Sequence, residues 1–154
     1  MELVEQNYDQ AIQNIIKVYV AQMNSAMKIS KIMCEHSNEN ELTGDHVICG
    51  LIYRLMVPMT GEDMNDSLNK ADNILNDESS DEESEDSDEE SEELYYEIPK
   101  EKRKLKINNC NCDICSKIRE CVKGYESFET YDPMVTRFKN SIKETCEKHN
   151  IYLW

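Results

Sequence analysis

The first part of the chain carries apolar residues at the spacing of an amphipathic helix. Between residues 2 and 37 there is no glycine or proline, and apolar side chains return every three or four positions. This pattern predicts one long helix, with Asn24 and Ser25 as the place where it could be interrupted. A single helix cannot bury its own apolar stripe, so the stripe must pack against the next helix or another chain. The stripe is made of Tyr8, Ile12, Ile15, Ile16, Tyr19, Met23, Met27, Ile29, Ile32 and Met33.

Two shorter helices are expected next, because two threonines stand where an N-cap would begin each of them. Thr43 precedes a helix that should end before Pro58, and Thr60 precedes one that should end near Asn76. Their apolar positions are Val47, Ile48, Leu51, Ile52 and Leu55 in the first, and Met64, Leu68, Ala71 and Leu75 in the second.

A last helix is predicted near the end of the chain. Asp132 is a good N-cap and Pro133 suits the first helical turn, so the helix should run from there to about Asn150. Its apolar stripe is Val135, Phe138 and Ile142, and the apolar residues that follow from Ile151 should be tucked against the protein. The fold class expected from these segments is mostly α.

Charge divides the chain into three parts. The net charge is −15, but residues 77–93 hold 12 acids, 5 serines and no base, so the rest is nearly balanced. We therefore expect a helical domain at 1–76, a disordered acidic linker at 77–93 and a cysteine-rich helical tail at 94–154. The linker could simply keep the protein soluble, or it could imitate nucleic acid and dock on basic proteins. Its serines beside acids resemble targets of acidophilic kinases.

The acidic balance argues against a protein that binds nucleic acid by itself, since Lys and Arg dominate phosphate binding. One basic cluster follows the acidic tract between Lys100 and Lys106. It could be a nuclear-import signal, a phosphate contact or an intramolecular partner of the acidic tract. The residues expected to act there are Lys102, Arg103, Lys104 and Lys106.

Seven cysteines point to metal rather than to disulfides. No apolar run is long enough to cross a bilayer, and the acidic start of the chain is not typical of a secretory signal, so we expect an intracellular protein with reduced thiols. A structural zinc ion takes four nitrogen or sulfur ligands, often in pairs two residues apart. The expected ligands are Cys112, Cys115, Cys146 and His149, with Cys110 and Cys121 as alternative ligands. Otherwise the cysteines would be small buried apolar residues.

A second group of metal-binding residue types flanks the loop between the first two predicted helices. It comprises Cys34, His36, His46 and Cys49. These residues could form another site, although a histidine at a helix end more often interacts with the last carbonyls of that helix. No glycine loop for phosphate and no nucleophile motif stands out, and we expect a protein that is not an enzyme.

The junction from Glu35 to Leu51 resembles the histone fold. In that family a long central helix ends, a short loop follows, and a Leu-Thr or Val-Thr pair precedes a short helix. Leu42-Thr43, Val47 and Gly50-Leu51 fall at matching places. The resemblance covers about half of the chain, and Leu-Thr-x-Asp is also a general helix-capping pattern.

The chain departs from the histone pattern in three ways. There is almost no room for the short helix that precedes the long one in histones. The loop reads Asn38-Glu-Asn-Glu41 where DNA-wrapping histones carry Arg or Lys, and His46 stands where the family's acidic residue is usual. Direct DNA contact by this loop is therefore not expected.

The histone resemblance implies pairing of two such units. The expected role is that of a non-enzymatic accessory in chromatin-like DNA packaging or transcription, dimerising with itself or with a basic histone-like chain. The alternative is a structural or virion-associated protein without nucleic-acid contact. The Asn, Lys, Ile and Tyr bias resembles that of large DNA viruses, so the expected locations are the nucleus, a viral factory or the virion. The interface would comprise Ile12, Ile16, Tyr19, Met23, Met27, Val47 and Leu51.

Overall fold

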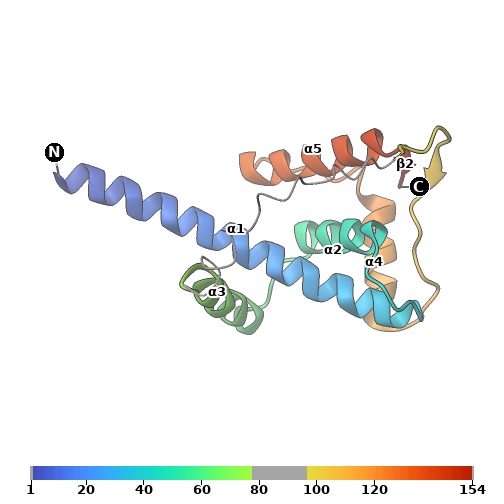
Figure 1. Cartoon of the computed structure of the whole chain (residues 1–154), viewed down its shortest axis with the longest axis horizontal. Coiled ribbons are helices and arrows are strands. Elements are labelled where there is room, and N and C mark those ends of the chain that lie inside the picture. The colour runs from blue at the N-terminus through green and yellow to red at the C-terminus, as the bar shows by residue number, and fades with distance from the viewer. Residues whose placement is uncertain (1, 78–96, 154) are drawn as a thin grey trace, which may run out of the picture.

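The chain is mostly helical, as predicted. A computed structural model describes residues 2–77 and 97–153 (Figure 1). Apart from Asp77, the predicted acidic linker lies outside these described residues. The elements, in order, are α1 (Glu2–His36), α2 (Gly44–Met56), α3 (Gly61–Leu75), β1 (Arg103–Lys104), α4 (Asp113–Gly124), α5 (Pro133–Lys148) and β2 (Ile151–Tyr152).

Helix α1 is continuous and runs through Asn24 and Ser25 without interruption. Its buried residues begin at Ala21, and residues 2–16 are all exposed on a part of the helix that extends beyond the rest of the protein (Figure 1). The C-terminal part carries the core residues Ile29 and Met33. The long helix therefore has two different halves, one packed and one projecting.

Helix α2 begins after Thr43 as predicted. The Thr43 hydroxyl accepts a hydrogen bond from the His46 backbone N–H at 3.5 Å, and the Thr43 N–H donates to His46 Nδ1 at 3.0 Å, which completes a capping box. Gly50 of α2 sits directly against α1, where a Cβ would lie 2.1 Å from Ser30 Oγ and 2.4 Å from the Ala26 carbonyl oxygen. Only glycine allows this close approach of the two helices.

Helix α3 also begins at its predicted cap, since the Thr60 hydroxyl accepts a hydrogen bond from Asp63 N–H at 3.2 Å. It folds back against α1, and Ala71 is fully buried there. Lys17 of α1 and Asp72 of α3 form a salt bridge at 2.8 Å. The third helix thus supports the middle of α1 on the side away from α5 (Figure 1).

The two predicted helical parts share one hydrophobic core. Helices α4 and α5 both pack against α2. Ile48 and Ile52 of α2 belong to the same buried cluster as residues from the C-terminal half. Those residues are Leu105, Ile118, Cys121, Val122, Tyr125, Ile142, Cys146 and Leu153. The C-terminal half is therefore packed onto the first half rather than folded around a core of its own.

A short parallel strand pair includes two residues of the basic cluster. Arg103 pairs with Ile151 and Lys104 with Tyr152. The Arg103 guanidinium donates two hydrogen bonds to the Asp45 carboxylate, both at 2.8 Å, and Lys106 N–H donates a third at 2.8 Å. The Arg103 side chain is thus paired with buried Asp45 within the chain, while a role of this cluster in phosphate binding or nuclear import stays a prediction. Lys102, Lys104 and Lys106 remain on the surface.

The residues predicted for a dimer interface fall into two groups. Ile12, Ile16 and Met23 are exposed on α1. The others are half-buried: Tyr19, Met27, Val47 and Leu51. Tyr19 lies against Phe138 of α5 with ring centroids 5.0 Å apart, and Leu51 packs against the core. Some residues of the predicted dimer interface thus make intramolecular contacts instead.

Candidate metal centre

Three cysteines and one histidine from distant parts of the chain meet at the end of α1. Their donor atoms all lie within 4.8 Å of one another. From His36 Nδ1 the distances are 3.5 Å to Cys110 Sγ, 3.2 Å to Cys112 Sγ and 3.4 Å to Cys115 Sγ. The residues are His36, Cys110, Cys112 and Cys115.

Each ligand is held by a different local structure. His36 is the last residue of α1, and Cys110 lies in the extended segment that leads from β1 past the end of that helix. Cys112 is the N-cap of α4, and its sulfur accepts a hydrogen bond from Cys115 N–H at 3.4 Å. Cys115 follows in the first turn of α4 and is buried. The Cys-x-Cys-x2-Cys spacing thus turns three sulfurs toward one point as the helix begins.

Asn108 joins this cluster to α1. Its side-chain amide donates to the Met33 carbonyl oxygen at 3.3 Å and lies 3.4 Å from Cys115 Sγ. Arg119 of α4 donates to the Asn108 carbonyl oxygen at 3.1 Å, which fixes the segment from the other side. Partners of this kind orient metal ligands and are part of a built site.

The electrostatic setting favours thiolate at one of the cysteines. Hydrogen bonds, first the one from Cys115 N–H, lower the pKa of Cys112 to about 6. Burial raises the pKa of Cys115 to about 11. A bound cation would be needed to hold all three sulfurs as thiolates, and the positive end of the α4 dipole would also stabilise the negative charge of those thiolates.

The donor set fits a tetrahedral zinc ion. Zinc bonds of about 2.3 Å to sulfur and 2.0–2.1 Å to nitrogen place a sulfur and a nitrogen ligand about 3.5 Å apart. The three sulfur-to-Nδ1 distances of 3.2–3.5 Å lie close to that value. A recess of about 410 Å³ reaches His36 and Cys110 from the surface, so an ion has a route in. The cluster can hold a metal ion such as zinc.

The structure gives the site a ligand that the sequence did not assign to it. Cys110, Cys112 and Cys115 come together as a local group, whereas the fourth donor is His36 rather than Cys146 or His149. Cys146 points into the hydrophobic core, and His149 is the C-cap of α5. The predicted Cys146–His149 pair is therefore corrected, and so is the alternative ligand Cys121, which is buried in the core.

The second group of metal-binding residue types is separated into other roles. The Cys34 thiol donates to the carbonyl oxygens of Glu39 at 3.5 Å and Glu41 at 3.4 Å, which closes the loop after α1. His46 completes the α2 capping box, and Cys49 is fully buried. Only His36 of that group reaches the metal cluster, and a lone histidine at a helix end was its one sequence signal.

Comparisons with protein-family models, with curated proteins and with solved structures found no match. Within the described residues, no helix combines the length and the apolar character needed to cross a membrane. The function therefore has to be inferred from the chain itself.

Proposed function

We propose that this chain is a non-enzymatic architectural protein that assembles through α1 and carries a structural zinc ion. Its role would be that of a histone-like accessory in DNA packaging or transcription, acting with a basic partner. The observation that carries the assembly role is the row of exposed apolar residues on the projecting part of α1. A contiguous group of exposed apolar side chains on a protein surface commonly marks an interaction surface.

The zinc ion would act as a structural clamp. Four protein ligands complete a tetrahedral site and leave no position for a substrate or an activated water, which is the pattern of structural zinc. The ion would tie the end of α1 to the start of α4, and with them the two halves of the chain. Zinc supplies binding energy that becomes folding energy when the ligands come from separate segments.

A basic partner is supported by the charge of the chain. At a net charge of −15 this protein would be repelled by phosphate. A Lys- and Arg-rich partner chain would be attracted to this protein. The loop after α1 carries Glu39 and Glu41, which also disfavours direct phosphate contact. The same loop supports the second candidate, a structural or virion-associated protein that assembles without nucleic acid.

The zinc claim is tested by native mass spectrometry of the full chain. We expect one zinc ion per chain that is lost in a chelator, and loss of zinc in His36→Ala and Cys112→Ser. The matched control is His149→Ala, since His149 is an exposed histidine outside the cluster. Retained zinc in His36→Ala together with lost zinc in His149→Ala would restore the Cys146–His149 pair and refute this ligand set.

The assembly role is tested by sedimentation of the chain with purified core histones and with short duplex DNA. We expect a complex with the basic histones, and association with DNA only when those histones are present. Direct binding to DNA alone would refute the charge reasoning. Self-assembly without binding to either histones or DNA would favour the structural alternative.

A further inference from the structure

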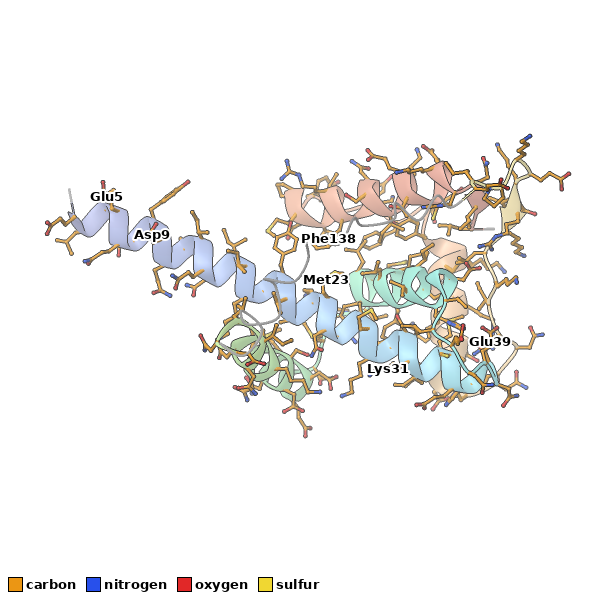
Figure 2. The ribbon with its side chains drawn as sticks, in the orientation of Figure 1. Glu5, Asp9, Met23, Lys31, Glu39 and Phe138 are labelled. Atoms are coloured by element: carbon orange, nitrogen blue, oxygen red, sulfur yellow. The ribbon has the colours of Figure 1, made fainter. Side chains whose placement is uncertain are left out.

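The projecting part of α1, residues 2–16, is here named the α1 arm. Every residue of the arm is exposed. The apolar side chains are strongly so, with exposed fractions of 75% at Leu3, 73% at Val4 and 67% at Tyr8. Figure 2 shows Glu5 and Asp9 on this same projecting part, away from the other helices. Isolated helices of about 12–15 residues are marginal in water, so the arm calls for a covering surface.

Five apolar residues of the arm lie on one side of the helix. At 3.6 residues per turn, Val4, Tyr8, Ile12 and Ile16 form a row of positions four apart, with Ile15 beside it. The side opposite holds uncharged amides that can remain in water. These are Gln6, Asn7, Gln10, Gln13 and Asn14. Leu3 lies on the same side as these amides, and Glu5 lies on the stripe beside Ile12 and Ile16. The face is therefore an apolar stripe with one acidic residue, and the back is largely polar.

We infer that a second copy of this chain covers the stripe, with the two α1 arms packed antiparallel. The row of four matches itself when it is reversed. Val4 of one copy then lies opposite Ile16 of the other, and Tyr8 lies opposite Ile12. Ala11 lies beside the row at the edge of the stripe and adds little bulk there. An interface that presents the same patch from both partners is the usual form of a two-fold dimer.

The exposed area agrees with a dimer of this kind. The five residues of the stripe expose apolar surface on the order of 500 Å² per copy, from their exposed fractions of 38–73%. A standard interface buries about 800 Å² per partner, of which a little over half is apolar. The stripe therefore supplies about the apolar area that a stable dimer requires.

Pairing of the arms deepens the proposed function and rests on its claim that α1 mediates assembly. It assigns the arm to a second copy and leaves the rest of the acidic surface to a basic partner. The zinc cluster lies at the opposite end of α1, so the dimer contact and the metal site are separate (Figure 1).

Sedimentation and light scattering of the full chain at micromolar concentration test the pairing. We expect a dimer for the natural chain and a monomer for Val4→Glu and for Ile16→Lys. The double variant Val4→Glu/Ile16→Lys should be a dimer again, because each introduced glutamate faces an introduced lysine of the other copy. Within one chain the two positions are about 18 Å apart along the helix and cannot pair. Gln13→Asp, on the polar back, is the matched control and should remain a dimer.

Three outcomes would overturn the pairing: a monomeric natural chain, a monomeric double variant, or a monomeric Gln13→Asp. Circular dichroism checks that each variant stays folded, which is expected because no arm residue is buried. A monomer that still binds core histones would refute self-pairing and leave the proposed function standing. A dimer that binds no basic partner would support self-pairing and refute the proposed role with a basic partner.

Discussion

Replacement of Gly50 by alanine should separate α1 from α2 and destabilise the protein. The added Cβ would lie 2.4 Å from the Ala26 carbonyl oxygen, a backbone atom that cannot rotate away. An ordinary contact needs about 3.4 Å, so the helices would have to move apart by about 1 Å. This movement would loosen the packing of Ile52 and Met33, both nearly or fully buried in the core.

The expected loss can be worked out from three effects. Overpacking a core typically costs about 1–3 kcal/mol. The hydrogen bond that Ser30 Oγ donates to the Ala26 carbonyl at 2.8 Å would also be disturbed, at about 1 kcal/mol. Alanine favours a helix interior over glycine by about 1 kcal/mol, which offsets part of the loss. The free energy of unfolding should therefore fall by about 2 kcal/mol.

Urea unfolding followed by circular dichroism, with zinc present, measures this change. A loss of about 2 kcal/mol would lower the urea midpoint by roughly 1 M. Gly61→Ala is the control, since nothing lies within 4 Å of a Cβ built there, and it should not lower the midpoint. The double variant Gly50→Ala/Ser30→Ala should recover part of the lost free energy of unfolding. It removes the clash with the Ser30 hydroxyl but keeps the clash with the Ala26 carbonyl oxygen. If Gly50→Ala is as stable as Gly61→Ala, the close approach of the helices is wrong.

Two further variants test the core and its ion pair. Ile118→Ala should lower the free energy of unfolding by about 3 kcal/mol, because Ile118 is fully buried where the two halves meet; an unchanged urea midpoint would contradict the shared core. Asp45→Asn tests the pH dependence: burial raises the pKa of Asp45, but hydrogen bonds from Arg103 and Lys106 N–H outweigh it and lower that pKa below its ordinary value. The carboxylate thus stabilises the fold above the unfolded pKa of about 4, and this contribution is lost as the pH falls through the lower folded value. Unfolding midpoints measured from pH 6 down to pH 2 should therefore fall less steeply for Asp45→Asn than for the natural chain, and equal slopes would contradict the assigned pairing.

Much of the helical structure could be predicted from local signals. Thr43, Thr60 and Asp132 each cap a helix where the sequence predicts one, and residues 2–36 form the expected long helix. These features depend on neighbours within one turn, so the sequence contains them directly. The parallel pairing of β1 with β2 could not be predicted, because each strand has two residues and the partners lie far apart in the chain.

The candidate site was predictable only in its local part. Cys110, Cys112 and Cys115 stand close in sequence, whereas His36 precedes Cys110 by 74 positions and joins them only through packing of α4 near the end of α1. Cys146 shares its residue type with the ligands but faces the core, and spacing alone does not distinguish these roles. The same holds for Arg103. The sequence shows its positive charge, but its pairing with Asp45 depends on the fold.

The shared core and the metal cluster have a consequence for synthesis on the ribosome. Ile48 and Ile52 emerge early, yet the side chains that cover them, such as Ile118, come more than sixty residues later. Until then the apolar face of α2 is open to water and is a target for chaperones. A zinc ion could not join His36 to Cys110 before α4 has begun to form, and its binding energy would then add to the stability of the completed fold. Metal binding would thus be the last step of folding, and it would stabilise a fold that is completed only after α4 has been synthesised.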